Sequence, residues 1–310
     1  MVELLRLIRV RTLAFAAVTM YAMRLLVIRP VLELNGCKLQ MDDFSFVLLV
    51  VAICCLISAA YVINDYFDMK SDRISGVRNI VIGKSISRQS AIVLHSVLNA
   101  IAVGIGIVLG FILGEWKLGF ALLVVSGLLW FYSFRFKRFF LLSNIMVGLL
   151  SAMIPMSVVA YEEPLLVKMN AIICQETGLN FFILWRVTGF AWFVFLNTLM
   201  YEINKDIFSV EGDKNNGFNT IPVKAGGKIA RFIITLLIVV AIVSLGIALK
   251  LEYKGFNSLL IYGIVAILLP YILYAWAVNF KSENRALQLN LIRFLAIACI
   301  GASIFLSYTF

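Results

Sequence analysis

Nine long apolar runs, each near the length needed to cross a lipid bilayer, constrain this chain more than any other feature of its sequence. A spanning helix takes about 20 residues, so nine of them occupy roughly 180 of the 310 residues and leave the rest for loops. We therefore expect one all-α domain over residues 1–310, a polytopic membrane bundle of nine transmembrane helices. The runs lie at 11–29, 44–63, 90–113, 118–134, 143–160, 180–202, 231–250, 256–279 and 290–308.

The composition excludes several other classes of protein. Hydrophobic residues make up 62% of the chain and charged residues 14%, whereas a soluble domain is about 25% charged. A soluble enzyme, a disordered chain and a nucleic-acid-binding module are excluded on this ground. The net charge of +10 is concentrated in particular loops, so we interpret it as a signal of membrane topology.

Basic residues fall mainly on one side of the predicted membrane. The segment before the first run and the loops 64–89, 135–142, 203–230 and 280–289 carry most of the Lys and Arg. The other loops carry few basic residues and several acids. Cytoplasmic loops are enriched in Lys and Arg, which predicts a cytoplasmic N-terminus and a multi-pass protein of a bacterial or archaeal inner membrane.

Two acidic segments stand directly after apolar runs on this basic side. In the first, Asn64, Asp65, Asp68 and Asp72 follow the second run at spacings that place them on one face of a helix. In the second, Glu202, Asp206, Ser209 and Asp213 follow the sixth run. Their spacings of four, three and four residues also form one stripe if that helix continues beyond the bilayer.

Carboxylates stacked on one face repel each other and need compensation. Mg²⁺ would supply the compensating positive charge, because carboxylate oxygens bind it together with substrate phosphates. Two such helix faces opposite each other would hold metal ions that bind a diphosphate. Basic residues nearby, including Arg78 and Lys205, would contact the remaining phosphate oxygens.

Three motifs resemble those of the UbiA-type intramembrane prenyltransferases. Asn64-Asp65-x-x-Asp68-x-x-x-Asp72 is similar to the first aspartate motif of that family, and Lys205-Asp206-Ile207-x-x-Val210-Glu211-Gly212-Asp213 to the second. Tyr132-Ser133-Phe134-Arg135-Phe136-Lys137-Arg138 followed by Asn144 resembles a third segment. The resemblance covers nearly the whole chain.

The resemblance implies transfer of a polyprenyl group from its diphosphate to an acceptor, with Mg²⁺ as cofactor. It implies catalytic roles for Asp65, Asp68, Asp72, Asp206 and Asp213. The same five residues, with Asn64 and with Glu202 in support, would hold the metal. Arg78, Lys137 and Lys205 would bind the diphosphate. The residues of the second motif, together with the following Gly217-x-x-Thr220-Ile221-Pro222, most resemble those of family members that act on geranylgeranylglyceryl phosphate.

The chain departs from the family pattern at several positions. Many relatives carry an acid where Ser209 stands, so one carboxylate is missing from the second motif. Thr12 occupies the place of an Asn in the first helix. The usual Asn-x-Pro and Arg-Pro after the first motif are absent, and Arg78 is the substitute for that arginine.

Two other functions remain open. An aromatic acceptor, such as 4-hydroxybenzoate or a quinone precursor, would use the same metal chemistry. A cation-coupled transporter would also place acids in a membrane, although such acids usually lie near the midplane and here they end helices at one face. The expected partners are therefore a polyprenyl diphosphate, a lipid-soluble acceptor and membrane lipids. The sequence carries no signal for an oligomeric state.

Two further predictions concern polar residues outside the acidic segments. His95, the single histidine, is predicted to be a structural, hydrogen-bonded residue. Glu162 and Glu163 are predicted to be solvated on the far side of the membrane.

Overall fold

Nine membrane-length helices build the part of the chain that the computed structural model describes, namely residues 2–75, 81–134, 139–215, 217–252, 258–281 and 283–306. For residues 2 and 70–75 the description covers the backbone alone. Seven spans include α4 (Asp43–Ser75), α5 (Arg88–Ile112), α6 (Trp116–Phe134), α7 (Leu142–Met169), α9 (Leu179–Ile207), α12 (Gly227–Leu251) and α15 (Arg285–Leu306). The nine apolar runs predicted these spans, and the described residues contain no strand.

The first and eighth spans each contain a π-helical turn just before a proline. The first consists of α2 (Val10–Ala22), the π-helix η1 (Met23–Ile28) and α3 (Arg29–Leu34), with Pro30 at its start. The eighth consists of α13 (Ser258–Tyr262), η3 (Gly263–Leu268) and α14 (Leu269–Phe280), with Pro270. Proline has no N–H for the i−4 bond and its ring crowds the preceding turn. The wider turn lets each helix continue.

Helix α4 is longer than the bilayer requires. Its 33 residues extend about 50 Å at 1.5 Å per residue, whereas the hydrocarbon core is about 30 Å thick. The first half is almost entirely apolar, and the last three turns carry the first acidic segment. The helix therefore carries these acids out of the apolar region without interruption.

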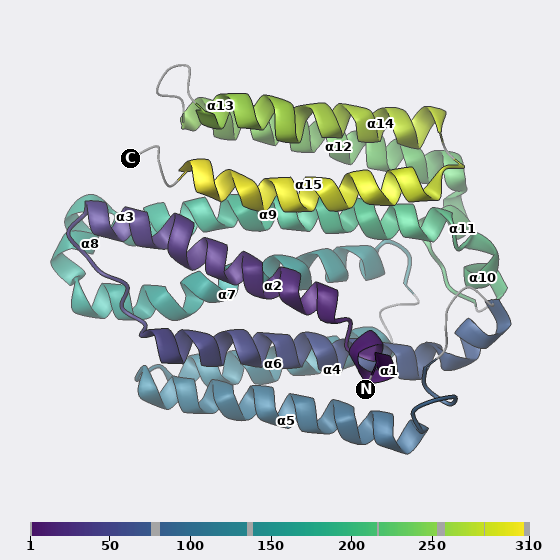
Figure 1. Cartoon of the computed structure of the whole chain (residues 1–310), viewed down its shortest axis with the longest axis horizontal. Coiled ribbons are helices and arrows are strands. Elements are labelled where there is room, and N and C mark those ends of the chain that lie inside the picture. Colours follow the sequence, from purple (N-terminus) through teal and green to yellow (C-terminus); the bar gives the residue numbers. More distant parts are fainter. Residues whose placement is uncertain are drawn as a thin grey trace.

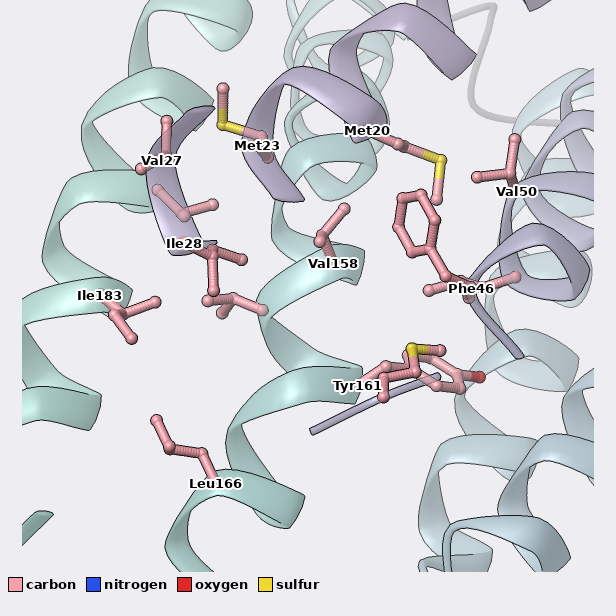
Figure 2. Packing of buried hydrophobic residues seen from close by; sticks show 14 of the residues in the cluster. Met20, Met23, Val27, Ile28, Phe46, Val50, Val158, Tyr161, Leu166 and Ile183 are labelled. Atoms are coloured by element: carbon pink, nitrogen blue, oxygen red, sulfur yellow. The ribbon is translucent and has the colours of Figure 1, made fainter. Parts of the chain in front are cut away.

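Two large apolar clusters and a small third one hold the bundle together. The largest joins η1, α4, α7 and the start of α9, and Figure 2 shows Met23, Ile28, Phe46, Val158 and Ile183 among its side chains. The second joins the end of α9 to α12, α14 and α15. Because α9 contributes to both clusters, it connects the two halves of the bundle.

Short helices mark the two ends of the bundle. At one end lies α8 (Ala171–Thr177), and α10 (Val210–Asn215) and α11 (Ile221–Ala225) lie at the other (Figure 1). Helix α10 packs against α4 and α9. The two acidic segments therefore share one end of the molecule, as the alternation of the loops predicted.

Candidate functional site

The first acidic segment presents a hydrogen-bonded amide and carboxylate. Asn64 Nδ2 donates to Asp68 Oδ2 at 3.1 Å, one helical turn away. Asp68 is only 5% exposed, and Asp65 is partly buried beside it. The backbone helix continues past Asp72, as predicted, but the Asp72 side chain lies outside the described residues.

An arginine from the N-terminus joins this segment. Arg9 Nη2 donates to Asp65 Oδ1 at 3.1 Å, and its guanidinium carbon lies 4.1 Å from the centre of the Tyr61 ring. Arg9 stands between α1 (Val2–Leu7) and α2 in the left-handed conformation, with φ 53°. In the sequence, Arg9 counted only as one of the basic residues that indicate membrane orientation. No pattern of neighbouring residues indicates an ion-pair partner 56 positions away.

The second acidic segment is divided between two helices. Helix α9 ends at Ile207, and α10 begins at Val210. The predicted single helical stripe from Glu202 to Asp213 is therefore wrong. Ser209 lies at the break, and its hydroxyl approaches the carbonyl oxygens of Lys205 and Asp206 at 3.4 Å each. Serine side chains compete for helical backbone groups in this way.

Asp206 is buried and oriented by an asparagine of α7. Asn144 Nδ2 donates to Asp206 Oδ2 at 2.9 Å, and Ser143 donates to Asn144 Oδ1 at 3.0 Å. Asp206 is 8% exposed and Asn144 is 2% exposed. Lys205, the residue before Asp206, forms an ion pair with Glu202, which lies one turn earlier on α9.

Asp213 is held by two hydroxyl groups. Ser209 Oγ donates to Asp213 Oδ2 at 3.0 Å, and Thr220 Oγ1 approaches the same oxygen at 3.4 Å. After α10 the backbone turns back toward Asp213, and the Phe218 N–H donates a hydrogen bond to the Asp213 carbonyl oxygen at 2.9 Å. Thr220 then precedes α11, which has Pro222 in its first turn. Ser209, which departs from the family pattern, is thus a direct partner of an acid of the motif.

Tyr132 of α6 lies near acids of both segments. The carboxylates of Glu202, Asp206 and Asp68 are all close enough to act electrostatically on its hydroxyl. Helix α4, which carries Asp68, packs against α6 and against α10, and α10 also packs against α9, which carries Asp206. That the two acidic faces together form one metal site stays a prediction.

The described donors fit Mg²⁺. No three Asp, Glu, His or Cys side chains among the described residues gather closely enough to enclose a metal ion by themselves. Mg²⁺ usually takes one or two carboxylates and completes its shell with water and substrate phosphates. Separate oxygen donors on two facing elements therefore suit a metal that binds together with a diphosphate.

Only one of the three predicted diphosphate contacts can be placed. Arg78 and Lys137 lie outside the described residues. Lys205 lies at the acidic end of α9, and Glu202 partly neutralises its charge. Arg9 adds a second cation at this end that sequence reasoning missed.

The prediction that Glu162 is exposed to solvent is wrong. Glu162 is 3% exposed and accepts hydrogen bonds from the backbone N–H groups of Gln40 and Met41, the latter at 3.2 Å. It anchors the loop between α3 and α4 because these amides have no helical partner. At the same end of the bundle, Arg186 donates to Glu252 at 2.5 Å.

His95 has the structural role that was predicted. Its Nδ1 lies 3.0 Å from the Ala59 carbonyl oxygen of α4, and Asn99 lies one turn further along α5 at 3.2 Å. His95 therefore ties α5 to α4 and does not reach the acidic segments.

Comparisons with known proteins agree with this arrangement. A model of the UbiA prenyltransferase family matches residues 38–307. The digeranylgeranylglyceryl phosphate synthase of Sulfolobus acidocaldarius is 33% identical over 241 residues, which cover 74% of this chain and 74% of that protein. The enzyme of the same name from Methanothermobacter thermautotrophicus is 31% identical over 188 residues, 61% of this chain and 58% of the relative.

Solved structures share the fold at low sequence identity. A UbiA homologue from Aeropyrum pernix has a TM-score of 0.67 at 17% identity and covers 95% of this chain and 97% of its own. A UbiA homologue from Archaeoglobus fulgidus, bound to GPP and Mg²⁺, has a TM-score of 0.62 at 16% identity and covers 98% and 99%. These similarities extend over nearly the whole bundle.

Proposed function

Because the chain belongs to the UbiA prenyltransferase family, we propose that it transfers a geranylgeranyl group from geranylgeranyl diphosphate to geranylgeranylglyceryl phosphate. The observation that carries the proposal is that α10, which bears Asp213, packs against both α4 and α9, the helices that carry the other acids, at one end of a membrane bundle. The names of the relatives, digeranylgeranylglyceryl phosphate synthases, support this choice of acceptor.

The acids of both segments would hold Mg²⁺, as the GPP- and Mg²⁺-bound homologue supports. We assign this role to Asn64, Asp65, Asp68, Asp72, Asp206 and Asp213, with Glu202 in support. The ion would supply positive charge to the diphosphate as it leaves. Arg9, Lys205, Arg78 and Lys137 would contact the phosphate oxygens.

The reaction follows from this placement of charge. The C–O bond of the diphosphate ester breaks, and its electron pair leaves with the diphosphate. The allylic cation that remains is attacked by the acceptor hydroxyl oxygen, which forms the new C–O bond and then loses its proton. Asn144 contributes by fixing Asp206, so that this carboxylate need not reorganise when charge develops.

We also propose that the acidic end of the bundle faces the cytoplasm, because the basic loops lie there. Single cysteines at Lys84 and at Asn35, both exposed, would test this orientation. Three of the five native cysteines are buried and two are half-buried, so background labelling should be low. Labelling of Lys84→Cys by an impermeant reagent added outside intact cells would contradict the orientation.

The function is tested with purified protein in lipid, labelled geranylgeranyl or farnesyl diphosphate, and a set of acceptors. Geranylgeranylglyceryl phosphate should give a diether product in Mg²⁺ and none in EDTA. A product with 4-hydroxybenzoate alone would move the proposal to an aromatic acceptor. Cation flux through liposomes without any prenyl product would favour the transporter instead.

A further inference from the structure

An arginine of α15 lies beside the second acidic segment. Arg293 Nη2 donates a hydrogen bond to the Tyr201 hydroxyl of α9 at 3.3 Å, and its guanidinium carbon lies 5.8 Å from the centre of the Tyr201 ring. Tyr201 directly precedes Glu202. Packing of α15 against α9 therefore brings a cation from the last helix to the start of this acidic segment.

No acid that the structure describes neutralises Arg293. Arg9 pairs with Asp65 and Lys205 pairs with Glu202, whereas Arg293 is exposed and forms no ion pair within the described part of the chain. The bond to the Tyr201 hydroxyl uses one of the five N–H donors of the guanidinium. The donors that remain form a planar fork that matches the oxygens of a phosphate.

The depth of Arg293 in the membrane suits a lipid head group. Arg293 lies near the start of the apolar run 290–308, and Tyr201 lies near the end of the run 180–202. Both residues therefore stand close to the membrane boundary on the side of the basic loops, where an arginine extends its guanidinium toward water. Ile297, one turn deeper on the same face of α15, is exposed and apolar. Helix α15 thus offers a cation to a head group and an apolar surface to a lipid tail.

The proposed acceptor carries the chemistry that fits this place. A glyceryl phosphate lipid combines an apolar tail, a phosphate and a free hydroxyl on one glycerol. Because glycerol is short, a phosphate bound at Arg293 keeps the reacting hydroxyl close to the residues that follow Tyr201, where the acidic segment begins. The diphosphate of the donor is assigned to the cations that pair with the acids themselves, among them Arg9 and Lys205.

We propose that Arg293, oriented by the Tyr201 hydroxyl, binds the phosphate group of the acceptor lipid and makes the protein selective for a glyceryl phosphate. This inference rests on the proposed function, because it names the residue that recognises the acceptor.

Binding of two lipids in the absence of prenyl diphosphate tests the proposal. The probes are geranylgeranylglyceryl phosphate and geranylgeranylglycerol, which differ only in the phosphate, and native mass spectrometry measures their retention by the full chain. The wild type should retain the phosphorylated lipid about tenfold better, because a charge-assisted contact separates the two probes. Arg293→Gln should lose most of this preference and Arg293→Lys should keep part of it. Unchanged retention of geranylgeranylglycerol by both variants shows that they are folded.

Arg285→Gln is the matched control. Arg285 is also an exposed arginine of α15 near an aromatic ring at the end of α9, with its guanidinium carbon 5.9 Å from the centre of the Phe208 ring. It lies eight residues before Arg293, outside the apolar run, so its loss should leave the phosphate preference unchanged. In turnover, Arg293→Gln should raise the KM for the acceptor about tenfold and leave the KM for the prenyl diphosphate unchanged.

Three results would overturn the proposal. An unchanged phosphate preference in Arg293→Gln would show that Arg293 does not bind the phosphate. An equal loss of preference in Arg285→Gln would indicate a general effect of surface charge. Displacement of the phosphorylated lipid by phosphatidylglycerol as readily as by unlabelled acceptor would make this region a surface for any anionic lipid. A phosphate preference that depends on Arg293, without any diether product, would contradict the proposed function and support this binding site.

Discussion

Asn144 of α7 and Asp206 of α9 are joined by a 2.9 Å hydrogen bond between side chains 62 positions apart. Both are buried among apolar helices, where a carboxylate without a partner would be costly. The amide fixes one carboxylate oxygen of Asp206. The orientation of an acid in the second motif is therefore decided by a helix that carries no acidic motif.

The hydrogen bond from Asn144 to Asp206 predicts what happens when the Asn144 side-chain amide is removed. Asn144→Ala should reduce prenyl transfer about 10- to 100-fold, the usual effect of losing a residue that orients a metal ligand. The Mg²⁺ concentration at half-maximal activity should rise as well. Ser143→Ala, which removes only the bond to Asn144, should have a smaller effect. Equal effects of the two substitutions would argue against a specific role for Asn144. Initial rates over a Mg²⁺ titration make the comparison.

Asp68→Asn keeps the shape of the side chain and removes its charge. We expect prenyl transfer to fall by at least about 100-fold, because charge stabilisation of the leaving group is the main contribution to such a reaction. Glu33→Gln, at an exposed ion pair with Arg29 at the other end of the bundle, should leave the rate unchanged. Full activity of Asp68→Asn in EDTA would rule out the metal mechanism.

Arg9→Gln should raise the KM for the prenyl diphosphate about tenfold, because one charge-assisted contact to phosphate is lost. Arg9→Lys should recover part of the affinity. Arg6→Gln is the control, since Arg6 pairs with Glu3 in an exposed position. If Arg9→Gln changed only the melting temperature and left KM alone, Arg9 would be a structural partner of Asp65.

Ser209→Asp places a carboxylate beside Asp213, at the position where Ser209 now donates a hydrogen bond at 3.0 Å. Like charges at this spacing cost a few tenths of a kcal/mol without metal, and bound Mg²⁺ should more than offset this. The Mg²⁺ midpoint should therefore fall several-fold, while Asp206→Asn should raise it. An unchanged midpoint with lower turnover would remove Ser209 from the metal site. Titrations at saturating diphosphate distinguish these results.

Glu162→Ala should destabilise the far end of the bundle. The backbone N–H groups of Gln40 and Met41 would lose their acceptor, at a cost of about 2 kcal/mol. Glu163→Ala, at the more exposed neighbouring position, should cost much less. Thermal unfolding in detergent measures both. Equal melting temperatures would show that water can replace the carboxylate.

The sequence by itself determined the nine spans and the helical face of the first acidic segment. Hydropathy and the 3.6-residue period are local properties, so they are readable wherever about 20 apolar residues or a run of acids occur. Helix α4 continues through the acids because nothing between Asn64 and Ser75 interrupts a helix. The single histidine was likewise predicted to be structural, because it lies early in the third apolar run, near the membrane interface.

Only the tertiary structure decided which side chains meet. The helix break at Ser209 depends on bonds to Asp213 and on the return of the chain to Thr220. The Arg9–Asp65 pair spans 56 positions, and the Glu162–Met41 bond spans 121. Packing of helices far apart in the sequence brings these groups together, and no local pattern of residues encodes a distance of that kind.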